Sequence, residues 1–144
     1  MINEDTIKLL KECNSGIKMG ISSLDEVLGR VKDENLKKVL SDCKEEHEKL
    51  ENETYELLNE YHDSGKEADA MAKGMSWLKT NVQLAMNDSD KTVANLITDG
   101  CNMGIKSLNK YLNQYEAAEE KVKDIAKRLI NLEEKLVVDL RQYL

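Results

Sequence analysis

The strongest constraint on the fold is a regular stripe of apolar and small side chains between residues 36 and 61. The stripe advances by alternating steps of four and three residues. Such steps place all members on one side of an α-helix and are typical of coiled-coil-like packing. The chain has no proline, the residue that most often interrupts a helix. The members of the stripe are Leu36, Leu40, Cys43, His47, Leu50, Thr54, Leu57 and Tyr61.

Three further segments have helical periodicity, so we predict long helices near residues 4–30, 34–63, 90–115 and 117–143. Side chains that can cap a helix start precede three of these segments: Asn3 or Asp5, Asp33, and the acidic break before residue 90. A stop with Gly65 at its end is predicted after the second helix. The fourth stripe is wholly apolar: Val122, Ile125, Leu129, Leu132, Leu136, Leu140 and Tyr143.

These elements predict a single all-α domain over residues 1–144, a ferritin-like four-helix bundle with an additional short crossover helix. Two helical hairpins, at about 4–63 and 90–143, are joined by a crossover segment, 66–88. One long connection makes the two middle helices parallel in such bundles. The alternative is an up-down-up-down bundle with the 66–88 segment packed outside.

A repeated motif suggests that the two hairpins arose by duplication. Cys13–Lys18 and Cys101–Lys106 share the pattern C-N-x-G-I-K, and they begin 88 residues apart. Helical bundles often carry metal-binding carboxylates at matched inward positions. Both copies hold Asn, Ile and Lys instead, which argues against an enzyme.

Charge and composition exclude several functional classes. The net charge is −7, whereas nucleic-acid binding needs a basic face. The apolar runs are far shorter than the roughly 20 residues that span a bilayer, so no membrane role is expected. The N-terminal sequence lacks the apolar region of a signal peptide, and the chain has three cysteines, an odd number. We therefore expect a cytoplasmic protein with reduced thiols.

Three segments carry a resemblance to a known family. The segments are residues 73–79 (KGMSWLK), 88–90 (DSD) and 99–104 (DGCNMG). Together they resemble the core of a bacterial ferritin-like four-helix-bundle family of unknown function. The resemblance implies a ferritin-like fold over nearly the whole chain. The family's Cys-Glu-x-Gly-Glu motif reads Cys101-Asn102-Met103-Gly104-Ile105 here, so both acids are missing. The resemblance therefore implies a degenerate member without the metal-binding carboxylates.

The residues themselves do not form a di-iron site. Such a site needs a Glu-x-x-His pair on each of two helices. Lys44 stands three residues before His47, and Asn59 stands three before His62. The least improbable metal ligands are Cys43, His47 and Glu51, which share one helix face. Buried cysteines more often pack as small apolar groups, so no metal and no cofactor is expected.

Two other features allow more than one interpretation. The glycine pairs 16/20 and 100/104 predict a close crossing of the first and third long helices, with a partner or ligand contact as the alternative. The Met- and Trp-containing cluster in the crossover segment is either core or an adaptable interaction surface. Its candidate surface residues are Met71, Met75 and Trp77.

Function is therefore expected to be non-enzymatic, a structural or protein-interaction role with the di-metal site lost. The partner would be another protein or a second copy of the chain in a homodimer. The alternative is a metal-binding or redox protein of the ferritin-like superfamily using Cys, His and Glu ligands. A third possibility is a binder of a small apolar ligand in the cleft between the glycine-bearing helices.

Overall fold

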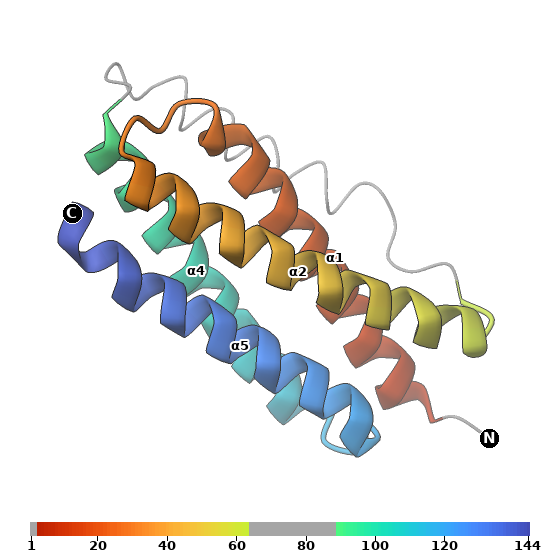
Figure 1. Ribbon diagram of the computed structural model, residues 1–144. Coiled ribbons are helices and arrows are strands. Elements are labelled where there is room, and N and C mark those ends of the chain that lie inside the picture. The colour runs from red at the N-terminus through yellow and green to blue at the C-terminus, as the bar shows by residue number, and fades with distance from the viewer. Residues whose placement is uncertain (1–2, 64–88) are drawn as a thin grey trace.

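A computed structural model describes residues 3–63 and 89–144, which form a bundle of four long helices (Figure 1). The helices are α1 (Glu4–Leu28), α2 (Glu34–Glu60), α4 (Asp90–Gln114) and α5 (Glu120–Leu140), followed by the short 3-10 helix η1 (Arg141–Tyr143). The all-α prediction is confirmed, and the described residues contain no strand. The predicted crossover helix and the candidate surface of Met71, Met75 and Trp77 lie outside the described residues.

Three of the four long helices begin at a side-chain cap. The side chains of Asn3, Asp33 and Ser89 each accept a hydrogen bond from a backbone N–H three residues later. These bonds satisfy N–H groups that have no partner inside the helix. After α2, the residue with a left-handed backbone is His62, with φ of 58°. The predicted role of Gly65 in this stop lies outside the described residues.

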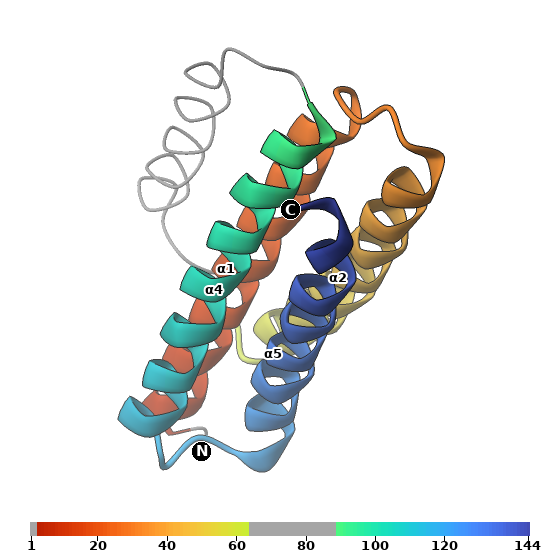
Figure 2. The same cartoon turned by 90° about the vertical axis from the view of Figure 1, so that its left-hand side faces the viewer.

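Hydrogen bonds at the two ends of the bundle define its topology. At one end the Asp90 carboxylate accepts bonds from the backbone N–H groups of Lys32 and Asp33, both at 2.9 Å. The starts of α4 and α2 therefore meet. At the other end the Glu119 N–H donates to the Thr6 hydroxyl at 2.9 Å, so the starts of α5 and α1 meet. The middle helices α2 and α4 consequently run parallel, as predicted, and each hairpin is antiparallel (Figure 2).

The apolar core has two parts, one toward each end of the bundle. One part contains Leu36, Leu40 and Leu140, and the other contains Leu50, Leu58 and Leu129. Leu132 packs against both parts. Between them, at mid-length, the bundle buries two ionisable side chains, His47 and Glu133, which are 2% and 8% exposed.

The predicted stripes are largely confirmed, with two corrections. In α2 the six stripe residues from Leu36 to Thr54 are buried, but Leu57 is only partly buried and the neighbouring Leu58 is buried instead. In α5 the stripe was predicted to be wholly apolar, and this is wrong. Glu133 is buried on the core side of the helix, whereas Leu132 is only partly buried. The buried side of α5 follows the same steps of four and three as α2: Val122, Ala126, Leu129, Glu133, Leu136 and Leu140.

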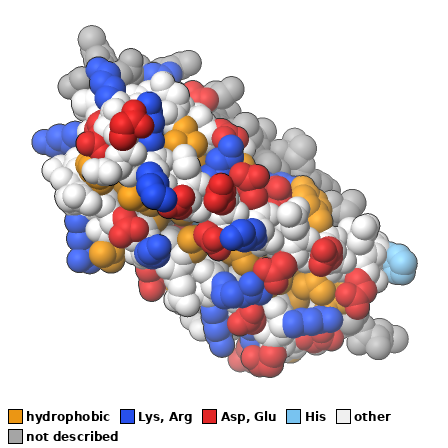
Figure 3. Space-filling model, viewed as in Figure 1, with side chains coloured by type: hydrophobic (Ala, Val, Ile, Leu, Met, Phe, Trp, Pro, Cys, Tyr) orange, Lys and Arg blue, Asp and Glu red, His pale blue; other side chains and the backbone are white. Residues whose placement is uncertain are grey.

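The outer face of α2 and α5 carries intermixed acidic and basic side chains (Figure 3). Arg128 of α5 makes a two-pronged ion pair with Glu53 of α2, with N–O distances of 2.7 and 2.9 Å. Most other ion pairs link residues three or four apart on one helix, which is typical of a solvated helix surface. None of the described helices combines the length and the apolar character needed to cross a membrane.

Candidate functional site

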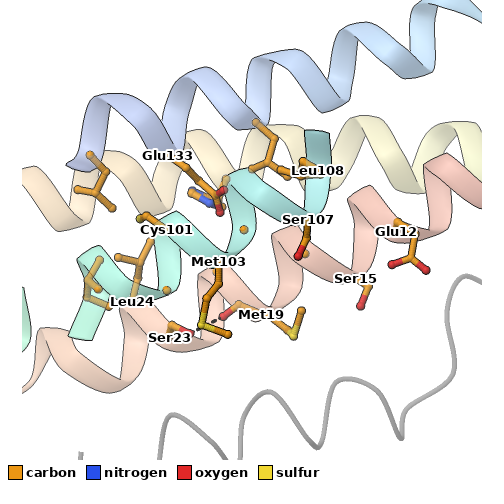
Figure 4. A pocket seen from close by; sticks show the side chains of 18 of the residues that line it. Glu12, Ser15, Met19, Ser23, Leu24, Cys101, Met103, Ser107, Leu108 and Glu133 are labelled. Atoms are coloured by element: carbon orange, nitrogen blue, oxygen red, sulfur yellow. Dashed lines mark hydrogen bonds between the residues drawn. The ribbon is translucent and has the colours of Figure 1, made fainter. Parts of the chain in front are cut away.

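A cavity of about 290 Å³ lies between α1 and α4 (Figure 4). Small residues on the two facing helices leave this space unfilled. Its floor is formed from the other two helices by His47 of α2 and by Leu129, Glu133 and Leu136 of α5. The volume is near the lower end of the range for small-molecule sites, about 300–1,000 Å³. The small residues that line it are Ser15, Gly16, Gly20, Ser23, Gly100, Gly104 and Ser107.

The glycines serve a purpose different from the predicted one. A Cβ atom on Gly20 would lie 2.9 Å from the His47 ring, and one on Gly104 would lie 2.6 Å from Glu133 Oε2. Among the described residues, a Cβ on Gly16 would meet only Leu129 at 4.0 Å, and one on Gly100 would meet none within 4 Å. Helices α1 and α4 do pack against each other, but among the described residues none of these glycines makes its closest contact with the facing helix. Gly20 and Gly104 instead make room for polar side chains from their hairpin partners.

Glu133 is the most unusual group in the cavity. It projects from α5 toward α4 (Figure 4), and its Oε2 atom is buried with no hydrogen-bond partner in the described structure. Burial disfavours the charged form and raises the pKa of Glu133 to about 8. The carboxyl is therefore mostly protonated at neutral pH. A buried polar atom without a partner is rare in proteins and requires an explanation.

His47 faces the cavity from the opposite hairpin and is held in one orientation. Its Nδ1 atom lies 2.8 Å from the backbone oxygen of Cys43. A carbonyl oxygen only accepts, so Nδ1 carries the proton and donates this bond. Burial lowers the pKa of His47, an effect that the bond to Cys43 partly opposes, so the ring is neutral near pH 7. The Nε2 atom, beside Gly20, is then a hydrogen-bond acceptor.

The three cysteines are buried and free. Burial raises the pKa of Cys13 and Cys43 to about 12, and it raises that of Cys101 as well. The Glu133 charge contributes to the increase at Cys43 and Cys101, so these two thiols lie near the carboxyl. Cys13 belongs to the other part of the core. Thiols that stay protonated are weak nucleophiles and weak metal ligands.

The predicted metal ligands are only partly brought together. Cys43 and His47 are in contact, with Sγ and Nδ1 3.6 Å apart. Glu51, one turn later, is only partly buried. No group of three or more His, Cys, Asp or Glu side chains within residues 3–63 and 89–144 is arranged to hold a metal ion.

Sequence reasoning missed Glu133, although a signal was present. Glu133 lies 86 residues after His47, and the same separation relates the buried stripe of α2 to that of α5. When the two stripes are aligned with this separation, Glu133 in α5 takes the same position as His47 in α2. The apolar stripe chosen for α5 passed through the neighbouring Leu132 instead.

Comparisons with protein-family models, curated proteins and solved structures found no match to this chain, so the proposals below depend on its own residues and geometry.

Proposed function

We propose that this protein is a non-enzymatic helical bundle of ferritin-like topology, without a di-metal site, that binds a small and largely apolar molecule between α1 and α4. The parallel middle helices support the ferritin-like topology, because one long connection between hairpins produces that arrangement. Degenerate membership of the bacterial ferritin-like family remains part of this proposal. No catalytic residue is assigned.

The observation that carries the proposal is the cavity with Glu133 in its floor, whose buried Oε2 atom has no hydrogen-bond partner among the described residues. A purely structural bundle would gain stability by filling this space with larger side chains, since empty volume in a core is destabilising. Apolar walls with a few polar groups are also typical of small-molecule sites. Cavities of about 150 Å³ already bind benzene-sized molecules, so 290 Å³ accommodates a somewhat larger one.

A neutral hydrocarbon tests this function. Indane is apolar, rigid and somewhat larger than benzene, and its binding is measured by calorimetry and by the increase in Tm that a ligand of the folded state causes. Gly100→Phe places a large side chain at a position where a Cβ has open space, so it is expected to fill the cavity. Gly100→Ala is the matched control at the same position.

We expect indane to bind the wild type and Gly100→Ala and to lose at least tenfold in affinity for Gly100→Phe. The proposal fails if indane does not bind the wild type, or if all three proteins bind it equally. Circular dichroism establishes that each variant has folded.

A metal-binding or redox function is the alternative, supported by the contact between Cys43 and His47. Elemental analysis of anaerobically purified protein separates the two. If the wild type contains about one equivalent of metal and His47→Ala contains none, metal binding becomes the better assignment of function. The raised pKa of the Cys43 thiol argues against this outcome.

A further inference from the structure

We infer that the ligand is a small hydrophobic amine whose ammonium group pairs with Glu133. This inference rests on the proposed function and specifies the chemistry of the molecule that the cavity takes.

The described residues that line the cavity carry charges of one sign. Their charged side chains are Glu12 and Glu133, and none of them is Lys or Arg. The whole chain also carries a net charge of −7, which raises the local concentration of cations. Once it is ionised, Glu133 repels a ligand carboxylate or phosphate and attracts a cation.

Glu133 lacks the partner that an ammonium would provide. Its buried Oε2 atom has no hydrogen bond within the described structure, and no ion pair involving this carboxyl is found there. A buried carboxylate is stable only when it is paired and hydrogen-bonded. An ammonium group brings both a positive charge and donors in a compact head. Gly104 keeps the space around the carboxyl open.

His47 adds a second acceptor to the same cavity. Because Nδ1 donates to the Cys43 carbonyl, Nε2 presents a lone pair on the side of Gly20. The cavity therefore offers a ligand the carboxyl oxygen of Glu133, which lacks a partner among the described residues, and the imidazole acceptor of His47. Both select a donor, and the apolar walls select a hydrocarbon body.

Amine binding must displace a proton. The free carboxyl of Glu133 is mostly protonated at pH 7, and the ammonium pairs with its ionised form, so the carboxyl proton leaves to solvent. Of the other titratable groups facing it, Cys43 and His47 on α2 and Cys101 on α4 stay neutral near and above pH 7. Glu12 on α1 also lines the cavity.

Three probes of one shape test the inference: indane, indanol and aminoindane. We expect the wild type at pH 8 to bind aminoindane at least tenfold more tightly than indane or indanol. Between pH 6 and pH 8 the preference for the amine is expected to increase about fiftyfold, because ionising Glu133 costs tenfold in affinity for each pH unit below its pKa. Calorimetry in buffers of different ionisation enthalpy would detect the released proton.

Two variants assign the effect to the carboxyl. Glu133→Gln keeps the shape and removes the charge, so aminoindane is expected to lose its advantage while indane still binds. Gly104→Ala forces the carboxyl to move and is expected to reduce amine affinity, whereas Gly29→Ala, at the end of α1 and away from the described lining of the cavity, leaves it unchanged.

The outcomes separate this inference from the proposed function. Equal binding of indane and aminoindane at pH 8, or an amine preference that survives in Glu133→Gln, overturns the inference and leaves the binding function standing. If indanol binds more tightly than aminoindane, the ligand's polar group is a neutral hydrogen-bond donor, and the inference of an amine is overturned. If indane does not bind the wild type, the proposed function fails, and this inference fails with it.

Discussion

His47 and Glu133 occupy equivalent steps of the two hairpins, yet the bundle treats them differently. Each is a buried ionisable side chain beside a glycine of the antiparallel partner helix: His47 beside Gly20, and Glu133 beside Gly104. His47 is anchored by a hydrogen bond to its own backbone turn. Glu133 has an oxygen without any partner in the described structure. One position is therefore satisfied within the fold, and the other still needs a partner.

The difference shows how a repeated architecture can produce a specific site. Backbone geometry gives both hairpins the same central step, and a glycine opens space at each. The side chain then decides whether that space is a structural contact or a binding position. A histidine satisfies one ring nitrogen within its own helix, whereas the Glu133 carboxyl reaches away from α5 and ends in the cavity.

The largest expected effect is the dependence of stability on pH at Glu133. Its pKa is about 8 in the folded state, above the ordinary glutamate value of 4.5, so the folded state holds the proton more tightly. Stability is therefore fully present below about pH 4.5 and is lost as the pH rises through 8. We expect roughly 2–4 kcal/mol to be lost between pH 5 and pH 9, at about 1.4 kcal/mol per pKa unit. Urea unfolding at both pH values measures the loss.

Glu133→Gln provides the control for that measurement. It has no proton to lose, so its stability should change much less over the same pH range. An equal loss in the variant and the wild type would show that Glu133 is not the group responsible.

The next largest effect is expected at Gly20. Gly20→Ala places a methyl group 2.9 Å from the ring of His47, which its hydrogen bond to Cys43 holds in place. Overpacking of this kind costs about 1–3 kcal/mol. Gly16→Ala, one turn earlier, meets only ordinary contact and should gain up to about 1 kcal/mol from helix propensity. Thermal unfolding should show a lower Tm for Gly20→Ala and a higher Tm for Gly16→Ala than for the wild type. Similar Tm values for the two variants would mean that the His47 ring moves aside freely.

A smaller effect is expected at Gly104. The added methyl group of Gly104→Ala would collide with the carboxyl of Glu133, which is the far end of a flexible side chain and can swing aside. We expect the clash and the gain in helix propensity to leave a net cost of roughly 1 kcal/mol or less. Gly100→Ala on the same helix is the control, and chemical denaturation is precise enough to compare them. A cost larger than that at Gly20 would reverse the comparison and make Glu133 the anchored residue.

The smallest effect is expected at His47 in acid. Burial lowers its pKa in the folded state, so the unfolded chain binds the proton more readily. The contribution of His47 to stability is therefore present above the unfolded pKa of about 6.5 and is lost as the pH falls below it. The bond to the Cys43 carbonyl opposes the burial effect and keeps the slope shallow. Urea unfolding of His47→Gln and of the wild type between pH 7 and pH 5 measures this contribution. If the free energy of unfolding changes with pH equally in both proteins, His47 does not contribute.

The sequence predicted the helices well because their signals are local. Caps at Asn3 and Asp33 and the steps along α2 depend on residues close together in the chain. The candidate site was predicted only in part. Cys43 and His47 lie one turn apart and are indeed in contact, but Glu133 opposite Gly104 depends on how α5 packs on α4. A periodic pattern shows which face of a helix is buried, and it does not show which residue of a neighbouring helix fills the space.

The hydrogen bonds at the two ends of the bundle have a consequence for assembly. The Asp90 carboxylate binds the two residues just before α2, and Thr6 binds the residue just before α5, so each hairpin is tied to the start of a helix in the other. The information for docking the hairpins therefore lies within the hairpins themselves. Two separately produced fragments, 1–63 and 89–144, are expected to reconstitute a heterodimer in solution, as complementary halves of one protein.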